Sequence, residues 1–551
     1  MSASDKKKIR KEQATAFLTE KQKAEQAEAK KLKVYTVTFV TAMLLIVVVV
    51  LGVLGVRAVN NSGVFQKNTI AATIGENKLN SVELAYYYND AINEYYSNMY
   101  NQFTDYTDSY LEIMGLDKTK PLTEQIQDQE TNKTWATYFL EEALNQAKID
   151  YAMYAQAVND GFELPEEEKT NLDSLKSNLE TYAKLYGFSN SSQYLRAVYG
   201  YGADADSYVA YTERSVIADA YITEHHDTID YDDAAIREYE TGKEGNYNSY
   251  TYDYCYLSYT DFRTGGTEDE NGNKTYTDEE NNAARAAAKA AAEQVATATN
   301  LEELKAKAEA VQVNEDSEVA VNEHKDELFS AINGTLGKWL SEADRKEGDI
   351  AVIPNESTTT NEDGTETTLV NGYYVAMFHS KSDNKVKMGD VRHLLVEFEG
   401  GTQNEETEQK EYTEAEKNAA KTKAEEYFKT WTEGDKTEDS FIALVKEHSD
   451  DTSAEDGGLF ENVHPNASYT PNFLNWAIAE ERKAGDCEVI ETEFGYHVMY
   501  YVGDSKLNYR DYMISQEMRD ADHEEWYNGI VDAASAELAD TSKMKLDVTL
   551  G

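Results

Sequence analysis

The second half of the chain repeats itself, and this duplication restricts the possible folds more than any other feature. Four motifs recur in the same order at offsets of 123 to 137 residues. They are Gly265-Gly266-Thr267 and Gly400-Gly401-Thr402, YTDEENNAAR (276–285) and YTEAEKNAAK (412–421), WLSEADRKEGD (339–349) and WAIAEERKAGD (476–486), and NGYYVAMF (371–378) and FGYHVMYY (494–501). Self-similarity at near-constant spacing indicates a duplicated structural unit. Each copy has the pattern of a strand, a long helix, shorter helices and two strands, which predicts two α+β domains in tandem, at 246–385 and 386–504.

An apolar run near the N-terminus predicts a membrane anchor. Residues 34–56 contain no charged side chain, and about 20 apolar residues are enough to span a bilayer as a helix. The preceding segment, 1–33, has 10 basic and 5 acidic residues, so the positive-inside rule places it in the cytoplasm and the bulk of the chain outside the cell membrane. A cleaved signal peptide, with Val56-Arg57-Ala58 as a loose cleavage site, is the alternative. The run is longer than most signal peptides, which favours an uncleaved, single-pass signal anchor.

The composition excludes several classes of protein. A net charge of -51 argues against nucleic-acid binding, because contacts to phosphate depend on basic residues. Two cysteines in 551 residues exclude a disulfide scaffold and a cysteine-rich metal site. Apolar residues make up 40% of the chain, which is enough to build several hydrophobic cores.

Helical patterns surround the duplicated part. Apolar residues recur at spacings of three and four from about 82 to 240, which predicts a helical domain over 57–245 that contains many tyrosines. Residues 505–551 return to a helical pattern. A single terminal helix cannot bury its apolar face alone, so we expect this tail to dock on the helical domain and join both ends of the exterior chain.

Polar residues that are suited to chemistry gather in the second copy. His393 and His497 lie on predicted strands, and Asp450 and Asp451 precede a glycine-rich turn. Two neutral imidazoles on neighbouring strands can form a hydrogen bond and orient a buried acceptor. Zinc is the competing interpretation, but it needs a third protein ligand and an open position, and no HExxH or CxxC spacing is present. No metal or other cofactor is therefore expected.

The second copy resembles the parvulin-type peptidyl-prolyl isomerase domain. The resemblance rests on GDVRHLLVEF, FIALVKEHSDDTSAEDGGLF and FLNWAIAEERKAGDCEVIETEFGYHVMYY, in that family's order and spacing over about 387–503. The outer layout resembles the PrsA/SurA-type extracytoplasmic foldases, which have a helical chaperone module made from both chain ends. This resemblance implies a membrane-anchored isomerase and chaperone that acts on unfolded or newly secreted polypeptides with X-Pro bonds. A holdase chaperone with a vestigial isomerase site, or a structural surface protein, are the alternatives.

The resemblance also implies roles for individual residues. His393 and His497 match the family's paired active-site histidines, and Asp451 matches the position held by Asp or Cys. The remaining matches are to substrate-binding positions, Tyr469 and Phe473 in the proline pocket and Thr492 before the last strand. Two departures are GGLFEN in place of the family's GDLGW, and Tyr469 in place of Met. The first copy has Tyr374 at the position of His497 and Tyr254 at about that of His393, so we expect it to be degenerate and inactive.

The loop after the first strand of the second copy predicts substrate preference. Between Glu397 and Glu416 it has eight Glu and a single Lys, Lys410. Binding a phosphate group requires Arg or Lys side chains or clustered donors. The sequence therefore predicts no preference for phosphorylated Ser or Thr before proline.

Overall fold

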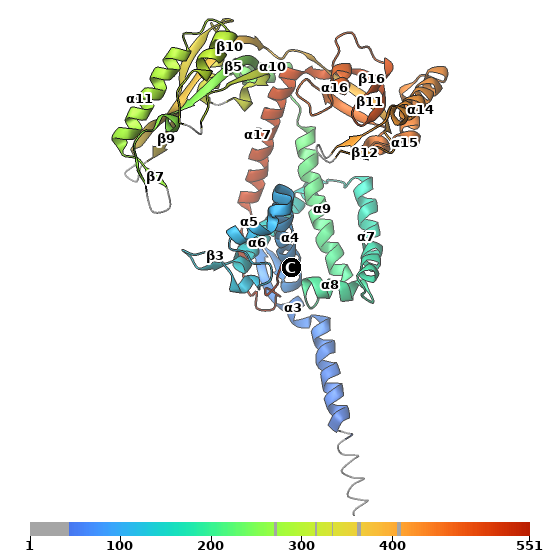
Figure 1. The fold of residues 1–551 in the computed structure, drawn as a ribbon. Coiled ribbons are helices and arrows are strands. Elements are labelled where there is room, and N and C mark those ends of the chain that lie inside the picture. The colour runs from blue at the N-terminus through green and yellow to red at the C-terminus, as the bar shows by residue number, and fades with distance from the viewer. Residues whose placement is uncertain are drawn as a thin grey trace, which may run out of the picture. The chain divides into compact units, whose positions relative to one another are not determined.

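The computed structural model describes residue 43 and residues 45–550, apart from 269–272, 315–316, 333, 361–364 and 405–408. The predicted cytoplasmic segment 1–33 and the beginning of the predicted anchor lie outside the described residues. The described chain forms two compact units, Met1–Ile229 with Asp522–Gly551, and Asp230–Ala521. Helices and antiparallel sheets occur in both, which confirms the α+β class (Figure 1).

The first unit is mainly helical, and both ends of the chain contribute to it. An apolar helix, Leu45–Ser62, precedes it, and none of that window is buried. Its other elements are α3 (Val64–Asn68), β1 (Ile70–Ile74), β2 (Asn77–Asn80), α4 (Ser81–Phe103), η1 (Thr104–Tyr106), α5 (Thr107–Ile113), η2 (Leu122–Glu124), β3 (Ile126–Asp128), β4 (Lys133–Thr134), α6 (Trp135–Asp160), α7 (Glu166–Leu185), α8 (Ser191–Tyr199), α9 (Ala205–Thr228) and β17 (Ala536–Leu538).

Tyrosines build much of the core of this unit. Helix α4 begins where the Asn80 side chain accepts hydrogen bonds from the first backbone N–H groups of the helix, and its Tyr86, Tyr87 and Tyr88 are almost fully buried. The C-terminal tail completes the core, because β17 pairs with β1 and the Tyr88 hydroxyl donates to the Leu546 carbonyl oxygen.

The second unit contains two four-stranded antiparallel sheets with the same strand order. In the first sheet the order is β8-β5-β10-β9, and in the second it is β14-β11-β16-β15. The elements of the first half are α10 (Asp233–Glu240), η3 (Glu244–Tyr247), β5 (Ser249–Ser258), η4 (Tyr259–Phe262), β6 (Thr267–Glu268), β7 (Lys274–Thr275), α11 (Asp278–Val295), α12 (Leu301–Glu309), β8 (Val321–Leu328), η5 (Phe329–Ala331), α13 (Gly334–Leu340), β9 (Ile350–Thr360) and β10 (Glu366–Ser382).

The second half of this unit repeats that succession of elements. They are β11 (Lys387–Glu397), β12 (Thr402–Gln403), β13 (Lys410–Glu411), α14 (Glu414–Glu433), α15 (Glu438–His448), η6 (Thr452–Asp456), β14 (Leu459–Val463), α16 (Pro471–Ala477), β15 (Cys487–Glu491) and β16 (Gly495–Asn508). Helix α14 packs against β16, as α11 packs against β10. Helix α17 (Tyr509–Ala533) follows, and the boundary between the units falls within it, at Ala521.

The structure explains why the Gly-Gly-Thr motif is repeated together with its downstream Glu. In the second copy the Glu416 carboxylate accepts hydrogen bonds from the backbone N–H groups of Thr413 and Gly401, so that it closes a capping box and also holds the glycine turn. A Cβ atom on Gly400 would lie 2.3 Å from Glu416 Oε1. Glu280 binds Thr277 and Gly266 in the same way in the first copy. The repeated motif therefore caps the N-terminus of the long helix in each copy.

Candidate active site

The two histidines of the second copy lie side by side on the central strands of its sheet. His393 on β11 faces Met499, and His497 on β16 faces Leu395, so the two imidazoles are diagonal neighbours. Their Nδ1 atoms are 2.9 Å apart, which is a hydrogen-bond distance. Only 3% of His393 and 5% of His497 is exposed. The pair therefore forms the buried base of the site.

A chain of hydrogen bonds extends the pair in both directions. At one end the Thr492 hydroxyl lies 2.9 Å from His497 Nε2. At the other end His393 Nε2 lies 3.3 Å from Ser453 Oγ and 3.5 Å from Asp451 Oδ1. The Ser453 hydroxyl and backbone N–H both donate to Asp451 Oδ1.

The carboxylate determines the direction of this chain. Asp451 can only accept, so His393 presents its Nε2 proton to it and leaves Nδ1 as the acceptor. His497 then donates from Nδ1, and its Nε2 accepts from the Thr492 hydroxyl. These tautomers are assigned from the network of hydrogen bonds.

Burial and hydrogen bonding fix the charge of the site. Burial, followed by the neighbouring His393, lowers the pKa of His497 to about 3, so this imidazole is neutral near pH 7. The hydrogen bond from His393, together with those from Ser453, holds the pKa of Asp451 well below its usual range. At neutral pH the site therefore contains a neutral His497 imidazole and an ionised Asp451 carboxylate.

The loop that carries Asp451 is fixed to the edge of β11. Its Gly458 carbonyl oxygen accepts from the His393 backbone N–H, and a Cβ atom on Gly458 would lie 2.2 Å from the His393 carbonyl oxygen. Gly458 also has a φ of 67°, which favours glycine. Arg392 clamps the same loop by donating to the carbonyl oxygens of Asp456 and Gly457. The paired glycines therefore position the carboxylate.

Aromatic side chains form an apolar wall against the imidazoles. The Phe473 ring lies edge-on to both, with centroids 5.5 Å from His393 and 5.8 Å from His497. The ring centroid of Tyr469 lies 5.2 Å from that of Phe473. Phe460 completes the wall, at 5.0 Å from His393 and 5.4 Å from Tyr469. All six residues singled out in the sequence thus come together.

Two members of the site were not found from the sequence. Ser453 stands within the SDDTSAEDGG motif, where only the aspartates drew notice. Phe460 is the aromatic residue of GGLFEN, at the point where this chain departs from the parvulin pattern. Phe473 is only 4% exposed, whereas Phe460 and Tyr469 are half-buried. Phe460 therefore belongs to the more accessible part of the aromatic wall.

Comparison with protein families identifies the domain in which these residues lie. The model of the rotamase, PPIC-type PPIase domain matches residues 393–503. These residues form a parvulin-type peptidyl-prolyl isomerase domain. No curated protein matches the chain at a significant level.

Several solved structures are similar to parts of this chain. The PPIase domain of TbPar42 is 22% identical over 21% of this chain and 98% of its own, with a TM-score of 0.17. Peptidylprolyl isomerase (PrsA) from Bacillus anthracis is 22% identical over 27% of this chain and 59% of its own, with a TM-score of 0.17. PrsA from Bacillus subtilis is 23% identical over 27% and 47%, with a TM-score of 0.16. The chain thus spans about half the length of these PrsA proteins.

Strand register relates the isomerase site to the first copy. Tyr374 faces Tyr256 on β5, as His497 faces Leu395 on β11. Tyr254, two residues earlier on β5, therefore occupies the position of His393. Its ring centroid lies 5.4 Å from that of Tyr374. Two phenols replace the two imidazoles of the isomerase site in the first copy.

Zinc binding is the competing interpretation of the histidine pair. Within the part of the chain that the structure describes, no three His, Cys, Asp or Glu side chains are arranged to hold a metal ion. In His393 and His497, the two Nδ1 atoms face each other, and each Nε2 already has a protein partner.

Proposed function

We propose that this protein is a membrane-anchored, extracytoplasmic peptidyl-prolyl cis-trans isomerase and chaperone that assists the folding of secreted proteins. The observation that carries the proposal is the hydrogen-bonded pair His393 and His497 beneath an aromatic wall, with Asp451 ionised at its edge. The family match over residues 393–503 supports the isomerase activity. The unfolded or newly secreted polypeptides that it acts on are recognised by their X-Pro bonds.

The reaction requires an apolar binding surface and does not require a nucleophile. Rotation about an X-Pro bond is slow because amide resonance gives a barrier of about 18–20 kcal/mol. An apolar surface against the proline ring disfavours the charge-separated planar amide, and the twisted transition state is thereby bound more tightly than the ground state. Phe460, Tyr469 and Phe473 supply this surface.

The polar residues have separate parts in this mechanism. The imidazoles are almost fully buried, so His393 and His497 act through what they hold in place. Asp451 and Ser453 are half-buried at the edge of the site, so a bound peptide could contact them directly. We infer that the imidazole pair fixes the orientation of this edge and that Thr492 fixes the imidazole pair.

An isomerisation assay tests this proposal. The intact chain in detergent is mixed with a proline-containing peptide, and the rate of cis-to-trans conversion is measured for Phe460→Ala, Asp451→Ala and the parent. Both variants should lose activity, because one removes part of the wall and the other removes the edge carboxylate. Tyr374→Phe, in the first copy, is the matched control. Parent-like rates in both active-site variants would contradict the proposal.

Membrane anchoring rests on the apolar helix. Leu45–Ser62 is long enough to cross a bilayer, and the basic segment before it predicts a cytoplasmic N-terminus. Protease added to intact cells should therefore digest residues 57–551 as it digests known surface proteins. Protection of this part while surface proteins are degraded would refute the topology.

A holdase with a vestigial isomerase site is the second candidate. The near-complete burial of both imidazoles favours it, as does an open groove of about 600 Å³ in the first unit, lined by Pro165, Val216 and Ala220 among acidic side chains. The two candidates separate when aggregation of an unfolded client is measured beside isomerisation. A holdase should keep its suppression of aggregation in Asp451→Ala, and the parent should show no isomerisation above background.

A further inference from the structure

A cavity lies between helices α4 and α6 of the first unit. The two helices pack against each other (Figure 1), and the cavity has a volume of about 250 Å³. A water molecule takes up about 30 Å³, so this space is large enough for one long side chain. Besides side-chain amides, the residues that line it include Tyr87, Asp90, Glu94, Tyr95, Tyr138 and Glu142.

Two carboxylates of this cavity lack the partners that other carboxylates on the same helices have. Glu83 on α4 and Glu141 on α6 each pair with a basic side chain, at 2.7 Å and 2.5 Å. Glu94 and Glu142 are exposed and form no ion pair with any residue that the structure describes. None of the described residues that line the cavity is Lys or Arg. The negative charge of the cavity is therefore not compensated by the chain.

A third carboxylate, Asp90, is half-buried in the same cavity. Burial raises the pKa of Asp90, although the Tyr211 hydroxyl donates a hydrogen bond to it at 2.5 Å. A cation beside this carboxylate would stabilise its ionised form, because an opposite charge offsets the cost of burial. The cavity is therefore suited to a positively charged ligand.

Two buried hydroxyl groups of the cavity have no hydrogen-bond partner among the residues that the structure describes. They belong to Tyr87 and Tyr95, and Tyr87 is only 1% exposed. A buried polar group without a partner costs free energy. A phenol oxygen can accept a hydrogen bond, so a ligand that brings N–H donors would recover this cost. The hydroxyls thus point to a ligand independently of the carboxylates.

The aromatic rings of the cavity favour a planar cation. The ring of Tyr95 lies 5.5 Å from that of Phe139 and 6.3 Å from that of Tyr138. Tyr138 already accepts a cation from the chain, because Lys133 Nζ lies 5.2 Å from its ring centroid. A guanidinium group stacks on aromatic rings and has five N–H donors, whereas an ammonium group has three donors and is more strongly hydrated. Arginine therefore fits the cavity better than lysine.

We propose that this cavity binds the guanidinium group of an arginine side chain in an unfolded client polypeptide. The guanidinium would donate to the carboxylates of Glu94 and Glu142 and to the hydroxyl oxygen of Tyr95. This inference rests on the chaperone function proposed above and names a feature by which clients are selected. The selection is separate from the recognition of proline in the isomerase domain.

Fluorescence anisotropy of a labelled peptide with the intact chain in detergent tests the cavity. The peptide has no proline, and its central residue is arginine, lysine or citrulline, which resembles arginine in shape but has no charge. The arginine peptide should bind about tenfold more tightly than the citrulline peptide, because a hydrogen bond to a charged group contributes at least this factor. Equal binding of these two peptides would overturn the inference. Lysine binding as tight as arginine binding would overturn the assignment to a guanidinium group.

Substitution of the two unpaired carboxylates locates the site. The double variant Glu94→Gln/Glu142→Gln should bind the arginine peptide about as weakly as the parent binds the citrulline peptide. The matched control Glu112→Gln/Glu213→Gln changes two exposed carboxylates outside the cavity and should bind as the parent does. Equal losses in the two double variants would show that only the overall charge matters, and would overturn the site.

The role of the Tyr95 hydroxyl has its own test. Tyr95→Phe should weaken the binding of the arginine peptide severalfold. Its thermal unfolding temperature should be equal to or above that of the parent, because the variant lacks an unpartnered buried hydroxyl. Unchanged binding would overturn the part assigned to this hydroxyl.

Suppression of aggregation is measured separately with an unfolded client that contains arginine. It should be weaker in Glu94→Gln/Glu142→Gln than in the parent, and equal suppression would overturn the client as the source of the arginine. A parent that selects the arginine peptide but suppresses no aggregation would contradict the chaperone function and leave the arginine site in place. The two failures are therefore distinguishable.

Discussion

Acidification should loosen the isomerase domain because it contains a buried neutral histidine. The pKa of His497 is about 3 in the folded protein and about 6.5 in the unfolded chain. Below pH 6.5 the unfolded chain therefore binds a proton that the folded domain does not. The stability that this group provides is fully present above pH 6.5 and is lost as the pH falls toward 3.

The size of the effect follows from the same two values. Each pH unit below 6.5 lowers the free energy of unfolding by about 1.4 kcal/mol, so the loss between pH 7 and pH 5 is about 2 kcal/mol. The pKa of Asp451 is lowered, so its contribution is lost only below about pH 4 and does not enter this window.

Amide hydrogen exchange of the intact chain measures this loss where it occurs. After correction for intrinsic rates, the amides of Leu394 and Val498, which are buried beside the pair, should exchange about 30-fold faster at pH 5 than at pH 7. His497→Gln can still form a hydrogen bond with Thr492 and does not titrate. The increase in exchange rate between pH 7 and pH 5 should therefore be about 30-fold smaller in this variant than in the parent. The same acceleration in parent and variant would refute the assignment of the acid sensitivity to His497.

Three further predictions concern the isomerase domain. His393→Ala and His497→Ala should each lower kcat/KM by about tenfold or more, which corresponds to a loss of about 1.4 kcal/mol of transition-state stabilisation. Tyr374→Ala, in the first copy, should leave kcat/KM near that of the parent. Equal losses from substitutions in the two copies would contradict a single active site. Gly458→Ala should lower the free energy of unfolding by about 2–3 kcal/mol in denaturant titrations, because its Cβ atom would meet the His393 carbonyl oxygen, whereas Gly503→Ala, which has open space, should not. Peptides with phosphoserine before proline should turn over more slowly than peptides with alanine, because the loop from Glu397 to Glu416 is acidic and repels the phosphate. Residues 405–408 of this loop lie outside the described residues. Faster turnover of the phosphoserine peptides would show that the loop does not face the substrate.

Local sequence patterns were sufficient for much of this protein. Periodicity and the duplicated motifs predicted the α+β class, which the structure confirms. The resemblance of the motifs around His393 and His497 to the parvulin family predicted the isomerase domain that the family comparison identifies. The fold class is readable because it depends on short-range rules, such as the alternation of side chains along β11.

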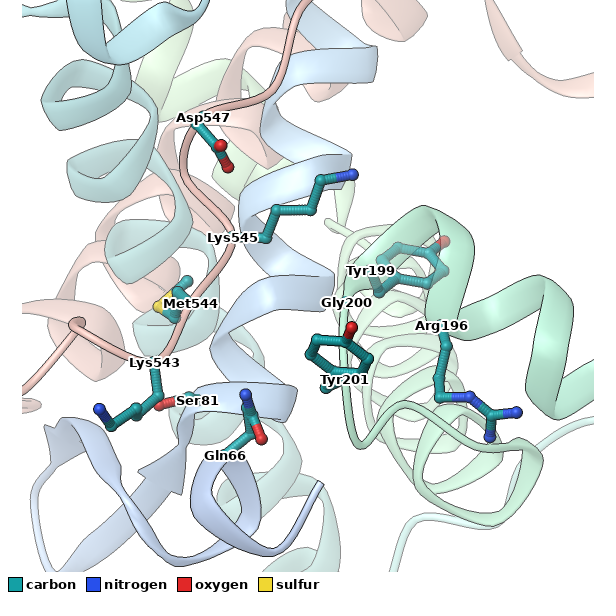
Figure 2. A pocket seen from close by; sticks show the side chains of 10 residues that line it. All are labelled: Gln66, Ser81, Arg196, Tyr199, Gly200, Tyr201, Lys543, Met544, Lys545 and Asp547. Atoms are coloured by element: carbon teal, nitrogen blue, oxygen red, sulfur yellow. The ribbon is translucent and has the colours of Figure 1, made fainter. Parts of the chain in front are cut away.

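Tertiary structure decided the contacts between residues that are far apart in the chain. The sequence does not show that His393 and His497 share a hydrogen bond across 104 positions, because this depends on the register between β11 and β16. Phe460 gave no signal, since its role comes from the pairing of β14 with β11 at the edge of the sheet. Gln66 and Lys545 line one pocket (Figure 2), and this too is set by the docking of the tail on the first unit, because hydrophobic burial and strand pairing are determined by the whole fold rather than by neighbouring residues.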